Sequence, residues 1–282
     1  MNRLNRLTEL VLIFAVSVMQ TACVTNPYTH RSQLIMMSEA QDTQMGLQAF
    51  QTELQQASDR ISNDPVETAP VMRVAEGVVA AAMRSRYAET AKRFKWQIVV
   101  IRDNQVANAS CLPGGKIMVY TGIFPFAANE AGLAAILGHE VTHALARHAA
   151  ERMSQTTLVQ VGMATANLAM AANGVNPIAQ QQIMQAVGLG TKYGVLLPFS
   201  REHESEADYI GLLLAAQAGY DPEEAVRVWQ RMEQAGGEQP PEFLSTHPSH
   251  GTRIQQLQQW MPEALGYYRA ANQVRHKCSG RC

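Results

Sequence analysis

The segment 139–143 of this chain reads HEVTH, an HExxH sequence. On an α-helix the side chains of His139 and His143 lie on one face, so both imidazoles can reach a single metal ion. Glu140 lies between them and can take the proton of a water molecule. The apolar residues at 133–137 indicate that this helix is largely buried. Buried imidazoles and a buried carboxylate need partners, which disfavours the alternative of a surface helix with two solvated histidines.

A catalytic zinc site needs a third protein ligand, and the residues just after the motif do not supply one. Ala146 and Ala149 occupy the positions at which an HxxGxxH continuation has its glycine and histidine. His148 is one residue out of register and is interpreted as a solvated or satisfied helix histidine. Glu151 follows His143 by eight residues, which is about 12 Å along a helix axis and too far for the same metal.

The next acidic residues lie in the cluster REHESEAD at 201–208. Glu204 and Asp208 share one helical face, and Glu202 and Glu206 share another. Either pair can supply one ligand, but only the first has an aspartate one turn on to orient a histidine ring. Spacing alone leaves this choice open.

The composition limits the size and the partners of the protein. The chain has 282 residues, of which 46% are hydrophobic, and a formal net charge of −1. This length allows one large domain or two small ones with an ample core. Because the charge is close to zero, the sequence gives no electrostatic footprint for nucleic acid, and we expect no nucleic-acid partner.

The N-terminus has the features of an export signal. A positively charged start precedes an apolar run at 11–19, which is shorter than the roughly 20 residues of a transmembrane helix. We therefore predict a signal peptide at 1–22. Ala22 before Cys23 resembles a bacterial lipobox, although Gln20 stands where an aliphatic residue is usual. The alternatives to a lipid on Cys23 are ordinary signal cleavage and an uncleaved anchor.

The residues around this cysteine suggest a location. Val24 follows Cys23, in place of the aspartate that resembles an inner-membrane retention signal. We therefore expect a protein on the periplasmic side of the bacterial outer membrane, anchored to it by lipid. Near the other end of the chain, Cys278 and Cys282 are close enough to pair in an oxidising periplasm, although this tail can also be loose.

The secondary-structure propensities of the residues, together with the turn and cap residues between segments, predict a mainly helical α+β fold with a small antiparallel sheet. A tether at 23–33 precedes a domain at 34–265 that carries the metal motif, and a C-terminal tail follows at 266–282. Strands are predicted at 96–101 and 116–121. Four helices are predicted with both ends, from near Ser38 to near 58, from near 70 to 93, from 129 to 153 and from 200 to 218. Two more are predicted to start at 221 and after 251.

The segment 153–191 contains no charged residue at all and is rich in alanine, glycine and amides. A buried helical hairpin is the favoured interpretation. A mobile lid over an active site is the second alternative, and an element that touches a membrane is the third.

Together these motifs resemble a known family. HExxH followed by Ser200-Arg201, Glu204 and Ala207-Asp208 is similar to the HtpX, Oma1 and CAAX-prenyl-protease group of zinc peptidases, which has HExxH followed much later by ExxAD. The resemblance spans 26–262, and the lipoprotein features resemble the periplasmic branch of the group. Further matching segments are 26–27, 31–34, 108–109, 113–115, 120–122 and 245–248.

The resemblance implies a gluzincin-type domain that binds one zinc ion per chain. It makes His139, His143 and Glu204 the ligands, and Asp208 the residue that orients a histidine. It also places His247 over the metal, where the ring can block the open coordination position or donate to an oxyanion. Arg253 is expected on the same wall.

The implied activity is that of a zinc metalloendopeptidase that cleaves unfolded or misassembled envelope proteins. Ser110 stands where an aromatic residue is common in the group. We expect no partners that bind through a repeat domain. Two other functions remain as alternatives. The first is a non-catalytic or latent assembly chaperone, and the second is a zinc amidase that acts on cell-wall peptides.

Overall fold

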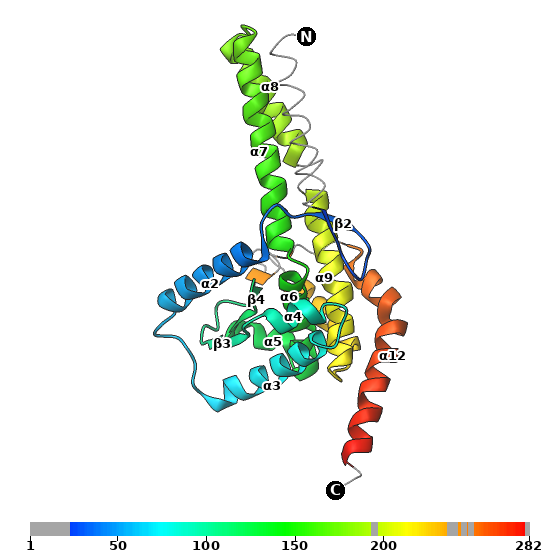
Figure 1. Cartoon of the computed structure of the whole chain (residues 1–282). Helices are drawn as coiled ribbons and strands as arrows, with labels where there is room; N and C mark the ends of the chain where they lie inside the picture. The colour runs from blue at the N-terminus through cyan, green and yellow to red at the C-terminus, as the bar shows by residue number, and fades with distance from the viewer. Residues whose placement is uncertain (1–22, 193–196, 236–241, 244–246, 248–250, 280–282) are drawn as a thin grey trace. The chain divides into compact units, whose positions relative to one another are not determined.

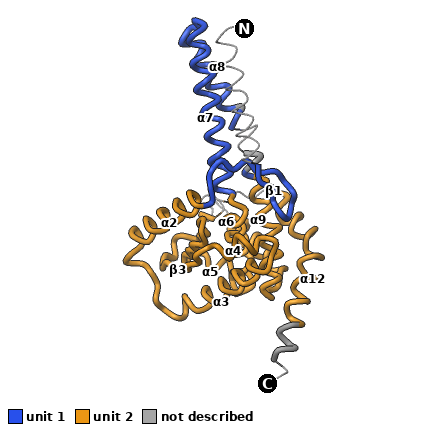
Figure 2. The backbone as a smooth tube through the Cα atoms, viewed as in Figure 1, with its two compact units in different colours: residues 1–39, 148–200 blue, residues 40–147, 201–282 orange. Residues whose placement is uncertain are grey.

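The computed structural model confirms a mainly helical α+β fold (Figure 1). It describes residues 23–192, 197–235, 242–243, 247 and 251–279. The predicted signal peptide and Cys282 lie outside these residues, as do the neighbours of His247 in the matching segment 245–248. The chain divides into two compact units, residues 1–39 with 148–200 and residues 40–147 with 201–282 (Figure 2).

The described elements fall into four successive groups, which are a pair of strands, a group of helices, three strands and a second group of helices. They are β1 (Cys23–Thr25), β2 (Ser32–Leu34), α2 (Glu39–Gln56), α3 (Pro65–Ala82), α4 (Ala88–Arg93), β3 (Gln97–Ile101), β4 (Ala109–Leu112), β5 (Lys116–Tyr120), η1 (Thr121–Ile123), α5 (Phe124–Ala127), α6 (Glu130–Leu145), α7 (His148–Ala172), α8 (Pro177–Thr191), α9 (Leu197–Gln217), α10 (Glu223–Ala235) and α12 (Arg253–Ser279).

The sheet of the larger unit is mixed and not wholly antiparallel as predicted. Its strand order is β3-β5-β4, with β3 and β5 parallel and β4 and β5 antiparallel. The turn at Gly114 and Gly115, both at φ +82°, joins β5 to the strand β4 that the sequence prediction missed. Because β4 lies in the connection, β5 returns in the direction of β3.

The predicted helix from near 70 to 93 is two helices. The first begins earlier because the Asp64 side chain accepts a hydrogen bond from Val66 N and Pro65 occupies the first turn. It ends at Ala82, whose carbonyl oxygen accepts hydrogen bonds from both Ser85 N and Ser85 Oγ. The helix α4 that follows is separate.

The helix predicted from 129 to 153 is also interrupted. Asn129 caps α6 as expected, because its side chain accepts from Gly132 N. Arg147 then adopts a left-handed backbone with φ +57°, and its Nε lies 2.9 Å from Asp42 Oδ2. The chain restarts as α7 at His148, which is buried.

Two glycines bring α6 and α9 into backbone contact. A Cβ atom built on Gly138 would lie 2.5 Å from Gly211 O, and one built on Gly211 would lie 2.6 Å from His139 N. Both distances are shorter than any real Cβ contact, so neither position admits a side chain without movement of the helices. This crossing sets the separation of the HExxH helix from the helix that carries Glu204.

The core of the larger unit surrounds this crossing. Buried side chains of α3, α6, α9 and the sheet form it, among them Val74, Leu137, Leu213 and Ile117. Burial of such side chains contributes about 1.5–3 kcal/mol each relative to exposure. The metal motif is therefore carried by helices that packing holds in place.

The smaller unit contains a β-hairpin and a helical hairpin. The predicted tether forms most of the antiparallel pair β1–β2. Arg31 makes two hydrogen bonds to the buried carboxylate of Glu151 on α7, and Gln33 Nε2 donates a third at 2.9 Å. These contacts hold the β-hairpin to the base of α7.

The uncharged segment 153–191 forms the helical hairpin α7–α8, as predicted, but the hairpin is exposed and not buried. The exposed fractions are 58% for Val161, 72% for Leu168 and 68% for Ile178. Sequence alone could not show this, because apolar composition does not tell which partner covers a helix. Within the described part of the chain, no helix combines the length and the apolar character needed to cross a membrane.

The glycine crossing predicts a specific sensitivity to a single methyl group. Gly211→Ala should lower the free energy of unfolding by about 1–3 kcal/mol, the usual cost of overpacking, and should weaken metal binding. Chemical denaturation and metal titration measure both effects.

The matched control is Gly162→Ala on α7, where an added Cβ meets no atom within 4 Å. There we expect no loss, and a gain of up to about 1 kcal/mol from helix propensity. Equal unfolding free energies and equal metal affinities of the two variants would show that the glycine crossing does not constrain the centre.

Candidate metal centre

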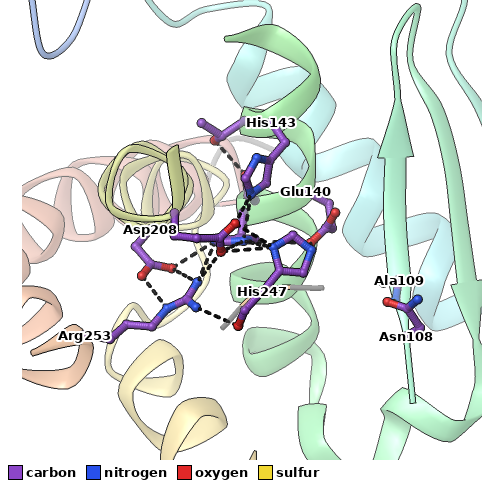
Figure 3. A network of polar contacts seen from close by, with 11 residues as sticks. Asn108, Ala109, Glu140, His143, Asp208, His247 and Arg253 are labelled. Atoms are coloured by element: carbon purple, nitrogen blue, oxygen red, sulfur yellow. Dashed lines mark hydrogen bonds and ion pairs between the residues drawn. The ribbon is translucent and has the colours of Figure 1, made fainter. Parts of the chain in front are cut away.

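Four side chains meet within the larger unit. His139 and His143 project from α6, Glu204 from α9, and His247 joins them from the described residues before α12. One potential ligand atom from each lies within 4.8 Å of every other. Figure 3 shows His143 and His247 close together, with Glu140 beside them.

The distances among these atoms are those of a shared ligand sphere. The Nε2 atoms of His139 and His143 are 3.0 Å apart, and His139 Nε2 lies 3.1 Å from His247 Nδ1. The Glu204 carboxylate lies 3.4 Å from His139 Nε2 and 3.5 Å from His143 Nε2. It also lies 3.0 Å from His247 Nδ1.

This donor set fits zinc. Zinc binds imidazole nitrogen and carboxylate oxygen at 2.0–2.2 Å, so the ligand atoms of a tetrahedral site lie about 3.3 Å from one another. The observed separations of 3.0–3.5 Å bracket that value. Three imidazoles and one carboxylate in van der Waals proximity, mostly buried, would otherwise be a poorly balanced polar cluster.

Asp208 and Arg253 form a buried ion pair behind His139. The Nδ1 atom of His139 donates to Asp208 Oδ1 at 3.0 Å, which leaves Nε2 facing the other ligands. Arg253 donates to the same Asp208 oxygen at 2.7 Å and is 2% exposed. The guanidinium therefore balances the carboxylate, and the carboxylate fixes the orientation of the ring.

Two aromatic side chains pack beside this ion pair and the ligands, and no sequence motif indicated either of them. Trp229 on α10 has the Arg253 guanidinium carbon 3.4 Å from its ring centroid, a cation–π contact. Phe243 is fully buried and stacks on His247, with ring centroids 4.6 Å apart at 29°. Both rings also contact His139, so they pack the ligands from the apolar side.

Glu140 lies on the other side of the cluster. It is buried, and its Oε1 is 3.3 Å from His247 Nε2 and 4.0 Å from His139 Nε2. The His247 ring thus lies between the ligand atoms and the carboxylate of the HExxH glutamate (Figure 3). Burial raises the pKa of the Glu140 carboxyl above its usual range, against the opposing effect of His247.

The charges of the ligands depend on one another. Burial lowers the pKa of His139, but its contacts with Asp208 and Glu204 outweigh burial and raise the pKa to about 9. Burial raises the pKa of Glu204, yet contacts with the three histidines hold it far below its usual range. A metal ligand must be unprotonated, so metal binding here releases a proton.

The structure places the other predicted residues elsewhere. Glu206 is buried on α9 but is not part of the ligand cluster found among the described residues. Ser110 lies on β4, and Cys23 is an exposed free cysteine at the start of β1. A disulfide between Cys278 and Cys282 remains a prediction.

Comparisons with known proteins agree with this geometry. Residues 65–261 match peptidase family M48. The mitochondrial metalloendopeptidase OMA1 of Schizosaccharomyces pombe is 37% identical over 84% of the chain and 66% of its own length. The metalloendopeptidase OMA1 of Homo sapiens is 30% identical over 92% of the chain and 49% of its own length.

A bacterial relative is more distant. The β-barrel assembly-enhancing protease of Escherichia coli is 27% identical over 77% of the chain and 43% of its own length. The chain thus spans less than two thirds of the length of these curated relatives. The family match covers the HExxH helix, the Glu204 helix and Arg253. On the strength of that match and of the OMA1 identity, the chain belongs to peptidase family M48.

Proposed function

We propose that this protein is a zinc-dependent metalloendopeptidase. The single observation that carries the proposal is the convergence of His139, His143 and Glu204 on one point, with the Glu140 carboxylate beside it. Three protein ligands leave one coordination position for water or substrate, which is the arrangement of a catalytic zinc.

The residues have distinct roles in peptide hydrolysis. His139, His143 and Glu204 would hold the zinc, which would supply polarisation of the scissile carbonyl and a lowered pKa for water. Glu140 accepts the proton of the attacking water and passes it to the leaving amine. Asp208 keeps His139 in the tautomer that presents Nε2, and Arg253 holds Asp208 in place.

His247 acts as a latch. Its Nδ1 lies among the ligand atoms and its Nε2 faces Glu140, so the ring occupies the space that a water molecule needs. Movement of this ring would vacate that space and free the Glu140 carboxylate. A small displacement also leaves the imidazole able to donate to a developing oxyanion.

The edge of the sheet supplies a place for an extended substrate. Strand β4 is the outer strand of the order β3-β5-β4, and α6 packs against it. A peptide can pair with the edge of β4 beside which the described residues place no strand, and run past Glu140. A peptide analogue bound only through side chains, with no main-chain pairing, would contradict this step.

The substrates and the location rest on the sequence. The E. coli relative is named for β-barrel assembly, and unfolded or misassembled envelope proteins are the substrates we propose here. Cys23, exposed at the start of β1, is the proposed site of the lipid that holds the chain at the periplasmic side of the outer membrane. Mass spectrometry of the mature N-terminus distinguishes a lipidated Cys23 from ordinary signal cleavage.

The ligand assignment predicts a difference between two buried glutamates of one helix. Glu204→Ala should lose zinc, because it removes a ligand. Glu206→Ala should keep it, because Glu206 is not in the cluster described here. Metal content by mass spectrometry after dialysis measures both. Zinc loss from Glu206→Ala with retention by Glu204→Ala would reverse the assignment.

The role of Glu140 predicts a separation of binding from catalysis. Glu140→Gln should bind zinc and fold normally, yet cleave casein on the order of 10²-fold more slowly, since a general base is missing. A chelator should abolish the wild-type activity. Near-normal cleavage by Glu140→Gln would remove Glu140 from the mechanism, and hydrolysis of a cell-wall peptide but not of casein would favour the amidase alternative.

The latch predicts an effect on ligands that need the fourth position. His247→Ala should retain zinc through the three remaining ligands and bind a hydroxamate about tenfold more tightly, if the open state is populated near 10% in the wild type. Calorimetric titration measures this affinity. Unchanged hydroxamate affinity would mean that His247 does not occupy the position in solution.

A further inference from the structure

The α7–α8 hairpin presents an uncharged surface that the proposed chemistry does not use. No Asp, Glu, Lys or Arg occurs from Met153 to Thr191, while the surface of a typical soluble domain carries about 25–35% charged residues. Within the same chain, α10 has five charged residues among its 13. Charge is therefore excluded from the hairpin specifically.

Large apolar side chains point outward from both helices. On α7 the exposed fractions are 58% for Val161 and 72% for Leu168, and on α8 they are 68% for Ile178 and 59% for Leu189. A single protein partner covers one face of a helix pair and leaves the opposite face to water, where charged residues are usual. Here the outward sides of both helices lack charge, which favours immersion in the boundary layer of a lipid bilayer over one docked protein.

Several polar groups of the hairpin are satisfied by acceptors within it. All four threonine hydroxyls of 153–191 donate at 2.8 Å to the carbonyl oxygen of the residue four positions earlier. The side-chain amide of Asn173 likewise donates to the carbonyl oxygen of Ala169. Between the two helices, Gln180 Nε2 donates to Asn167 O at 2.8 Å. Such internal bonding lowers the cost of removing a hydroxyl or amide from water.

The first charged residue on each side of the uncharged segment is positive. Arg152 precedes the uncharged segment and Lys192 follows it, and both lie where the antiparallel helices begin and end. The nearest acid, Glu151, is directed to Arg31 and Gln33. Cations that border an uncharged, partly apolar element are complementary to anionic lipid headgroups.

We propose that the α7–α8 hairpin is a membrane-contacting element that lies in the headgroup–acyl boundary of a lipid bilayer. Leu168 and Ile178, the most exposed apolar side chains beside its tip, enter the acyl region. The neutral amides of Gln181, Gln182 and Gln185 meet the headgroups, and Arg152 and Lys192 meet their phosphates. This contact is independent of any lipid on Cys23.

The test uses the full chain with Cys23→Ser in every arm and vesicles of phosphatidylethanolamine and phosphatidylglycerol. The double variant Leu168→Glu, Ile178→Glu should lower vesicle binding, measured by flotation, by about tenfold or more, because charge in the acyl region is costly. The matched control is Val66→Glu in the larger unit, where the valine is 82% exposed, and it should bind as the parent does.

A second measurement reports on the hairpin directly, whatever else holds the chain to vesicles. An environment-sensitive fluorophore on Leu168→Cys should shift to the blue with vesicles and be quenched by a nitroxide-bearing lipid. The same label on Val66→Cys should not respond. These variants carry Cys23→Ser, Cys278→Ser and Cys282→Ser, and Cys111 is buried.

No response of the label at position 168, with equal flotation of all variants, would overturn the proposal. So would self-association of the parent chain that the double glutamate variant abolishes, because the hairpin would then be an interface between copies. Casein cleavage by the double variant in detergent should equal that of the parent, so a failure here is distinct from a failure of the proposed peptidase activity.

Discussion

The backbone contact between Gly138 and Gly211 is the constraint on which the centre depends. It places α6 and α9 so close that His139, one residue from the first glycine, reaches both Glu204 and Asp208. If these helices were further apart, Glu204 on α9 could no longer reach the histidines on α6, even with every ligand residue present. The buried core of α3, α6, α9 and the sheet holds the helices at this distance, and small residues at the crossing permit it.

The charges of the centre are balanced in pairs. Arg253 compensates Asp208, and the Glu204 carboxylate lies within hydrogen-bond reach of the His247 ring. The Glu140 carboxylate differs, because its closest ionisable contact is the His247 ring at 3.3 Å. Displacement of that ring would release a buried carboxylate with a raised pKa, which is the property that proton abstraction requires.

Sequence reasoning predicted the parts of the molecule that follow from local chemistry. The HExxH spacing placed two imidazoles on one face, and Asn129 predicted the start of their helix. Helical spacing alone left Glu204 and Glu206 undecided, because both lie on one helix and only packing selects the face, whereas the family resemblance indicated Glu204. Sequence reasoning missed β4, the break at Arg147 and the aromatic wall of Trp229 and Phe243, which depend on contacts between distant segments. It predicted the α7–α8 hairpin but not its exposure.

X-ray absorption at the zinc edge of the purified full chain tests the central claim most directly. The account predicts one zinc ion with only nitrogen and oxygen neighbours at about 2.0–2.2 Å and the multiple-scattering pattern of imidazole. It also predicts loss of the ion in a chain that lacks His139 and His143. A sulfur neighbour near about 2.3 Å, or a chain that binds no zinc, would contradict the proposed centre.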